Sequence, residues 1–269
     1  MQNKSRTLIN LIGMPSLLGI IYLGDLFFTT FIYIVILLGT IEISKICNDK
    51  NYSVNVFWLY AIYLFMYVSH LVNFTLIDVK EIFILLVILL FIAQIIKKDN
   101  KPLASMSITL FVFIWIAVSL DCAIHIRNMQ DGMSLMYCIF LSVWMCDSAA
   151  YIFGKNFGKA KILPHISPNK TWVGTLSGYI FSSLLIYFLI SFDFIKIGNY
   201  LFNIQDAMMI GVIVGVFGQA GDLFESMIKR EFKIKDSGTL LQGHGGILDR
   251  FDSLLFVIPS FYLYIKFIL

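Results

Sequence analysis

Long apolar stretches recur along the whole chain and are separated by short polar segments. A helix that crosses a lipid bilayer needs about 20 mostly apolar residues. Nine stretches come close to this length, and they cover residues 7–24, 27–46, 54–72, 80–96, 103–120, 133–153, 172–191, 206–222 and 251–268. The pattern therefore predicts an all-α, polytopic integral membrane protein with about nine transmembrane helices.

The least regular of these stretches are the first two and the eighth. Only a short turn at residues 24–25 separates the first stretch from the second. The eighth carries glycines at intervals of three or four residues, namely Gly211, Gly215, Gly218 and Gly221. This spacing allows a neighbouring helix to approach closely, and it equally fits a flexible helix. Basic residues precede the first stretch as in a signal peptide, but the many further apolar stretches favour a first membrane span.

The positions of the basic residues predict the orientation in the membrane. Cytoplasmic loops of membrane proteins carry an excess of Lys and Arg. If the N-terminus is cytoplasmic, Lys80, Arg127, Lys196 and Lys266 lie outside, and the other 16 of the 20 Lys and Arg lie inside. The same orientation makes residues 154–171 and 223–250 two long cytoplasmic loops. We therefore expect a transmembrane scaffold over residues 1–132 and a catalytic region containing both loops over residues 133–269.

The composition agrees with this fold class and excludes others. Apolar residues make up 59% of the 269 residues and charged residues 14%, against about 45–50% and 25% in soluble domains. A water-soluble monomer and a disordered chain are both excluded. The net charge of +3 is too small to indicate nucleic-acid binding. The four cysteines lack paired spacing, so we interpret them as small apolar residues.

Acidic side chains cluster where the second long loop leaves and re-enters the membrane. Asp222 ends the eighth span, and Glu225 and Ser226 follow on the same helical face. Asp249 and Asp252 lie three residues apart at the start of the ninth span. Carboxylates at a membrane edge are costly and are functional candidates. Several together need neutralisation, and their oxygens are the ligands that Mg²⁺ prefers.

Basic residues and glycines lie beside these acids. The bases are Lys229, Arg230, Lys233, Lys235 and Arg250, and a turn of Gly243, His244, Gly245 and Gly246 precedes Asp249. Glycines admit a phosphate to the backbone N–H groups, and helix N-termini favour anions. The combination indicates phosphoryl or nucleotidyl transfer, which needs positioning and charge neutralisation. Considered one at a time, these residues also have ordinary explanations. The basic residues are typical of the cytoplasmic flank of a membrane helix, the aspartates are typical helix caps, and His244 is typical of a solvent-exposed loop.

The first long loop offers a second group of polar residues. Asp147 lies inside the sixth span, so we expect its side chain to face the protein interior. Ser167, Lys170 and Thr171 lead into the seventh span, where Thr171 can cap the helix and the three together can meet a phosphate. The remaining histidines have no comparable group of acids, bases and glycines beside them in the sequence, and we interpret them as structural: His70, His125 and His165.

Both loops resemble the signature of the phosphatidate cytidylyltransferase (CDP-diacylglycerol synthase) family. In the second loop the match comprises Ser226, Lys229-Arg230, Lys235-Asp236, His244 to Gly246 and Asp249 to Asp252. In the first loop it comprises Asp147, Ala150-Tyr151, Phe153-Gly154, Phe157-Gly158, Ser167-Pro168, Lys170 to Trp172 and Gly174. The specific match covers roughly residues 144–253, and the N-terminal half agrees only in being hydrophobic.

The resemblance implies an enzyme that transfers CMP from CTP to phosphatidate, giving CDP-diacylglycerol and pyrophosphate in phospholipid biosynthesis. It implies a requirement for Mg²⁺ and leaves a second cation open. It implies catalytic roles for Asp222, Lys229, Arg230, Lys235, Asp236, His244, Asp249, Arg250 and Asp252. It further implies substrate binding by Asp147, Ser167, Lys170, Thr171, Ser226, Gly245 and Gly246, and metal coordination by Asp222, Asp249 and Asp252.

Three positions depart from the family pattern. Gln242 stands where proline is usual, Val173 where glutamate is common, and Ser148 where threonine is frequent. Because the signature acids and bases remain, we expect an active enzyme.

Several alternatives stay open. The acceptor could be another lipid phosphate or, for a kinase, a polyprenol. A secondary transporter is a further alternative, although its ionisable residues should lie near mid-bilayer. We expect a bacterial inner membrane and no nucleic-acid partner, and a homodimer is left open.

Overall fold

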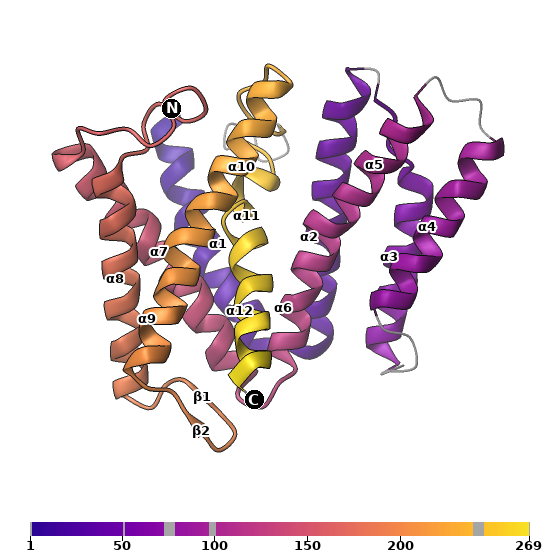
Figure 1. Cartoon of the computed structure of the whole chain (residues 1–269). Coiled ribbons are helices and arrows are strands. Elements are labelled where there is room, and N and C mark those ends of the chain that lie inside the picture. The colour runs from indigo at the N-terminus through magenta and orange to yellow at the C-terminus, as the bar shows by residue number, and fades with distance from the viewer. Residues whose placement is uncertain (1, 51, 73–78, 97–100, 239–244, 269) are drawn as a thin grey trace.

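The computed structural model describes residues 2–50, 52–72, 79–96, 101–238 and 245–268, with the side chains of these residues apart from 2–12 and 79. The chain forms helices that run back and forth between the two ends of a bundle (Figure 1). The first four are α1 (Gln2–Leu23), α2 (Asp25–Asn48), α3 (Val56–Leu71) and α4 (Val79–Ile96). The central pair is α7 (Gly132–Phe157) and α8 (Trp172–Ser191), and the chain ends with α11 (Leu248–Phe251) and α12 (Leu254–Ile268).

Two further helices contain a π-helical segment in the middle. In the first, α5 (Pro102–Val112) continues through η1 (Phe113–Val118) into α6 (Ser119–Arg127). In the second, α9 (Ile204–Val212) continues through η2 (Ile213–Phe217) into α10 (Gly218–Glu231). A π-helical turn locally changes which side chains face a neighbouring helix, and such turns are frequent at functional sites. The second one lies directly before α10, which carries Asp222 and Lys229.

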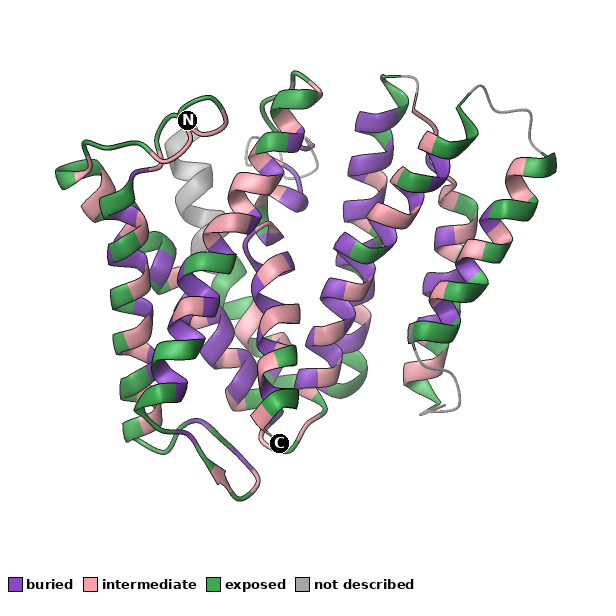
Figure 2. Cartoon of the chain, viewed as in Figure 1, coloured by how far each residue is buried: buried purple, intermediate pink, exposed green. Residues whose placement is uncertain are grey.

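The structure confirms an all-α protein with helices suited to a membrane. Five described helical segments are long and apolar enough to cross a bilayer: Asp25–Asn48, Pro102–Arg127, Gly132–Phe157, Trp172–Ser191 and Ile204–Glu231. Exposed positions recur along the helices (green in Figure 2), and many of them carry large apolar side chains, of which Ile95, Phe192 and Phe267 expose 84%, 80% and 88% of their surface. Apolar surface on this scale suits contact with lipid rather than with water.

The glycines of α9, η2 and α10 lie where other chain segments approach closely. A Cβ atom at Gly215 would come within 2.8 Å of the main-chain Cα of Tyr179 in α8. At Gly211 it would collide with the hydroxyl of Ser183, one turn further along α8. At Gly221 it would collide with the main-chain oxygen of Asp252. Of the two interpretations of these glycines, close packing is therefore the correct one.

Some boundaries differ from those that hydropathy predicts. The helix expected to end at residue 222 continues to Glu231, so the second loop begins about two turns later than predicted. The described residues also contain a short hairpin that the sequence pattern does not predict, formed by β1 (Lys196–Ile197) and β2 (Tyr200–Leu201). All four cysteines are free and buried or half-buried, as expected for small apolar side chains.

Candidate active site

The two polar loops lie at the same end of the bundle, the upper end in Figure 1. The first connects α7 to α8, and the second connects α10 to α11.

Thr171 has an extended backbone and its hydroxyl accepts a hydrogen bond from the N–H of Gly174, so it caps α8 as predicted. Its side chain is buried and packs against Gly154 of α7 and against Gly158, the residue that follows α7. Thr171 therefore fixes how the first loop meets both helices.

Asp249 is the most highly connected acid of the site. Its Oδ1 atom accepts a hydrogen bond of 2.6 Å from the ammonium group of Lys229. Its Oδ2 atom accepts hydrogen bonds from the N–H of Gly246 at 2.6 Å and from the N–H and hydroxyl of Ser237, both at 3.0 Å. Burial alone would raise the pKa of the Asp249 carboxyl group, but the bonds from Lys229 and Gly246 hold this pKa below its usual range.

The described end of the glycine turn, Gly245 and Gly246, lies against this carboxylate. Gly245 has a φ of +79°, in the left-handed region that favours glycine. A Cβ atom at Gly245 would collide with Oδ2 of Asp249, and one at Gly246 would collide with the hydroxyl of Ser237. The turn thus needs glycine to bring its backbone against Asp249. The N–H of Gly246, expected to face a phosphate, donates to Asp249 instead.

Lys229 links Asp249 to a second, deeply buried acid. Its ammonium group lies 2.6 Å from Oε2 of Glu225, one helical turn earlier in α10. The Glu225 side chain is 3% exposed, and within the described part of the chain its other oxygen, Oε1, has no hydrogen-bond partner. A buried carboxylate oxygen without a partner is costly. It is therefore an atom to which a cation could bind.

A further ion pair joins the first loop to α10. The ammonium group of Lys170, just before α8, lies 2.6 Å from Oδ2 of Asp222 and also donates to the main-chain oxygen of Gln219. Asp222 keeps 35% of its side chain exposed, so it remains accessible from solvent. Lys170 thus brings the first loop into contact with the acids of α10.

Asp252 completes the acidic group. It interacts electrostatically with Asp222, Glu225 and Asp147, which lie on α10 and α7. Its main-chain oxygen faces Gly221, where the absence of a side chain lets the start of the last helix approach α10. Asp147 interacts in turn with Asp222 and Lys170, but it is an exposed residue and not, as the sequence predicts, one enclosed in the protein interior. Residues from three separate segments thus contribute charge to one place.

The remaining predicted residues lie around this centre or outside the described residues. Arg230 is exposed, and its Nε donates to the main-chain oxygen of Ile166, next to the half-buried Ser167. Ser226 is half-buried on α10, and the exposed side chains are those of Lys235, Asp236 and Arg250. His244 and Gln242 lie outside the described residues. Val173 is an exposed residue of the first turn of α8, and Ser148 is an exposed residue of α7.

One buried acid of the N-terminal half also belongs to the site, and the sequence interpretation missed it. Glu42 of α2 is 3% exposed. Its Oε1 atom accepts a hydrogen bond of 2.8 Å from the N–H of Ile247, and its Oε2 atom accepts from the N–H of Leu248 at 3.0 Å and from the hydroxyl of Ser237 at 3.2 Å. Glu42 therefore holds both ends of the loop that carries the glycine turn. The signal in the sequence was a lone carboxylate inside an apolar span.

The charges of the site fit a hard divalent cation. Five carboxylates lie in the group, namely Asp147, Asp222, Glu225, Asp249 and Asp252, against the two ammonium groups of Lys170 and Lys229. This surplus, together with the partnerless oxygen of Glu225, suits Mg²⁺, which prefers oxygen ligands. The oxygens of Asp222, Asp249 and Asp252 do not all lie within 4.8 Å of one another in the structure. Coordination by these three aspartates stays a prediction.

Comparisons with known proteins agree with this arrangement. A model of the cytidylyltransferase family matches residues 4–268. The phosphatidate cytidylyltransferase of Bacillus subtilis is 33% identical over 263 residues, which cover 96% of each chain. That of Staphylococcus haemolyticus is 34% identical over 264 residues, covering 95% of this chain and 96% of its own. That of Rickettsia typhi is 34% identical over 184 residues, covering 68% of this chain and 81% of its own.

Proposed function

The chain belongs to the cytidylyltransferase family, and from this premise we propose that it transfers CMP from CTP to phosphatidate. The products are CDP-diacylglycerol, which stays in the membrane, and pyrophosphate. The relatives named above carry the name of this activity. The observation that carries the proposal is the group of paired acids and bases at one end of the bundle, drawn from α7, α10, α11 and the residues before α8.

We propose that this end of the bundle is cytoplasmic and that the nine apolar stretches cross a bacterial inner membrane. The sorting of basic residues supports this orientation, because 16 of the 20 lie in the segments that it makes cytoplasmic. CTP is a water-soluble nucleotide, whereas phosphatidate is anchored in the bilayer. A site at the ends of membrane helices is the place where both can meet.

In the proposed reaction, a phosphate oxygen of phosphatidate attacks the α-phosphorus of CTP. A new P–O bond forms, and the bond from the α-phosphorus to the oxygen bridging the β-phosphorus breaks, with its electron pair leaving on pyrophosphate. The exposed Arg230, Lys235 and Arg250 bind phosphate groups of the substrates. Lys170 and Lys229 are already paired with acids, so they hold the acids in place and lower the negative charge that the substrates meet.

We propose that Mg²⁺ is held by Asp222 and Asp252, with Glu225 offering its free oxygen. When bound, the ion neutralises charge on the phosphate oxygens and so assists both bond formation and bond cleavage. Asp249, the third ligand predicted from sequence, already accepts hydrogen bonds on both of its oxygens. Its proposed role is to fix Lys229 and the glycine turn.

The test is a reconstitution assay in phosphatidate-containing vesicles with CTP and Mg²⁺. We expect formation of CDP-diacylglycerol with an equal amount of pyrophosphate, loss of both products with a chelator, and recovery when Mg²⁺ is restored. Vesicles without phosphatidate are the control. Pyrophosphate release that is independent of phosphatidate, or transfer of the γ-phosphate to a polyprenol, would contradict the proposal.

A further inference from the structure

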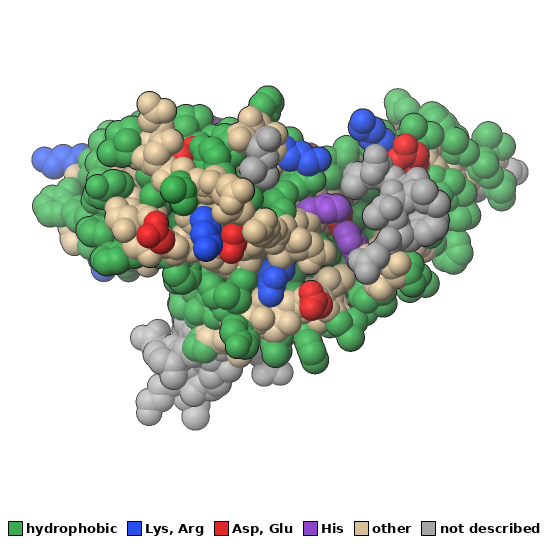
Figure 3. Space-filling view, turned by 90° about the horizontal axis from the view of Figure 1, so that it is seen from below, with side chains coloured by type: hydrophobic (Ala, Val, Ile, Leu, Met, Phe, Trp, Pro, Cys, Tyr) green, Lys and Arg blue, Asp and Glu red, His purple; other side chains and the backbone are tan. Residues whose placement is uncertain are grey.

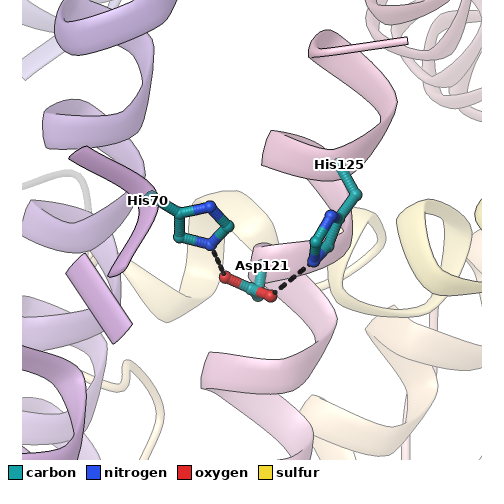
Figure 4. A group of neighbouring side chains, drawn as sticks. All are labelled: His70, Asp121 and His125. Atoms are coloured by element: carbon teal, nitrogen blue, oxygen red, sulfur yellow. Dashed lines mark hydrogen bonds and ion pairs between the residues drawn. The ribbon is translucent and has the colours of Figure 1, made fainter. Parts of the chain in front are cut away.

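Two histidines and one aspartate meet at a place that the proposed reaction does not use (Figure 4). His70 lies near the end of α3, and Asp121 and His125 lie one turn apart on α6. The Nε2 atom of His70 is 2.8 Å from Oδ1 of Asp121, and the Nε2 atom of His125 is 3.2 Å from its Oδ2. The two histidines are therefore not isolated from other ionisable side chains, and their structural interpretation stays a prediction.

The three side chains present a set of donor atoms suited to a transition metal. The two imidazole nitrogens and a carboxylate oxygen all lie within 4.8 Å of one another. Within the described part of the chain, this is the group of histidine, cysteine and acidic residues that meets this criterion. Zn²⁺ binds imidazole nitrogen and carboxylate oxygen at about 2.0–2.2 Å, and a site with three protein ligands leaves a fourth position for water.

The carboxylate of the group is buried and accepts a hydrogen bond from a neighbouring residue, as the carboxylate ligands of metal sites do. Asp121 is 2% exposed, and a carboxylate at this depth needs compensation of its charge. The hydroxyl of Tyr33 donates a 3.2 Å hydrogen bond to its Oδ1 atom. Hydrogen bonds of this kind orient the ligands of metal sites. The ring of His125 is further held by stacking on Tyr262, with ring centroids 5.8 Å apart.

The group is accessible from the end of the molecule opposite the proposed active site. His125 exposes 43% of its side chain and His70 exposes 19%. Histidine side chains are visible near the centre of the lower face (Figure 3), which is the face opposite the polar loops at the upper end in Figure 1. A metal ion can therefore reach the group without passing the acids of α10.

We propose that His70, Asp121 and His125 bind one divalent transition-metal ion, with Zn²⁺ as the best match. The ion ties α3 to α6 at the far end of the bundle from the nucleotide site. Its donor set differs from that of the proposed Mg²⁺ site, because imidazole nitrogens favour Zn²⁺ and its neighbours over Mg²⁺. The inference does not depend on the proposed reaction, because none of these residues lies among the acids and bases of the two loops.

The test uses the full chain in detergent, freed of metal with a chelator that is then removed. Titration with Zn²⁺, with Co²⁺ as a spectroscopic probe, should give one bound ion per chain and the visible absorption of Co²⁺ bound to nitrogen. Thermal unfolding should shift to higher temperature with Zn²⁺ and not with Mg²⁺. An excess of Mg²⁺ should not displace the bound ion.

Three variants assign the site. His125→Ala should lower Zn²⁺ affinity at least about tenfold, as should Tyr33→Phe through loss of the outer hydrogen bond. His165→Ala is the matched control, because this exposed histidine lies in the first loop at the other end of the bundle, and it should leave affinity unchanged. His125→Ala removes a half-exposed side chain, so folding should survive. Substoichiometric binding by the wild type, or equal affinity in His125→Ala, would overturn the proposal and leave a hydrogen-bonded group without a metal.

Discussion

Replacing Glu42 by glutamine tests whether a residue of the N-terminal half positions the proposed active site. In the structure this carboxylate accepts hydrogen bonds from Ile247, Leu248 and Ser237. Glutamine keeps the size of the side chain but replaces one accepting oxygen with an amino group. That group cannot accept a hydrogen bond from an N–H or a hydroxyl, so at least one of the three bonds is lost and the charge that strengthens the others disappears.

The size of the effect follows from these contacts. A hydrogen bond to a charged group contributes about 1.5–3 kcal/mol, and a buried donor left without a partner costs a further 1–3 kcal/mol. We therefore expect Glu42→Gln to weaken the native position of the loop by about 3 kcal/mol. Because about 1.4 kcal/mol corresponds to a factor of ten in rate, the loss of kcat is on the order of 100-fold if the whole effect falls on loop position.

The assay compares kcat for folded protein in vesicles with a matched variant. Asp206→Asn also changes a buried carboxylate, which accepts hydrogen bonds from Tyr200, Tyr264 and the N–H of Asn203. It lies at the start of α9, at the opposite end of the bundle. We expect both variants to lower the unfolding temperature and only Glu42→Gln to lower kcat. Wild-type kcat in Glu42→Gln, or an equal loss in Asp206→Asn, would refute the reasoning.

Two further predictions concern Asp249 and the close helix contact at Gly221, with Gly19 as a control for the second. Asp249→Asn breaks the largely buried ion pair with Lys229, which costs about 3–5 kcal/mol. We therefore expect turnover at least about 100-fold lower, with membrane insertion unchanged. Wild-type turnover in this variant would contradict the proposed role of Asp249. Gly221→Ala places a methyl group against the main chain of Asp252, and we expect both the unfolding temperature and turnover to fall. Gly19→Ala, which meets open space, should leave both unchanged, and a loss there would show that any added methyl group is harmful.

The five long apolar helices could be predicted from the sequence because apolar length is a local property. The end of α10 could not be predicted in this way. Its last turns carry Lys229, Arg230 and Glu231, so hydropathy drops although the backbone hydrogen bonds continue. A hydropathy pattern detects where apolar residues end, whereas the helix ends where its backbone bonding ends. The site residues on this segment thus lie on a regular helix and not on a loop.

Which acids and bases lie near one another could be predicted further than the contacts that they make. The acids and bases of both loops were identified by type and spacing, and Lys170 does meet Asp222. The partner of Asp249, in contrast, is Lys229, 20 residues earlier, and spacing alone cannot select this lysine among the other bases. The glycine turn fits equally well around a phosphate and around a carboxylate. Only the folded chain shows that the N–H of Gly246 donates to Asp249.

The contact of Glu42 with the loop also bears on the division of the chain into a scaffold and a catalytic region. Glu42 and Ile247 are 205 residues apart. The carboxylate caps the two N–H groups at the start of α11, which no side chain among the described residues of that segment caps. A fragment of residues 133–269 would leave these two N–H donors without this acceptor, whereas the hydroxyl of Ser237 would keep Asp249. Because buried donors without a partner are costly, the glycine turn would leave its position around Asp249. The N-terminal half therefore does more than anchor the site in the membrane, because Glu42 of α2 holds the loop of the site in position.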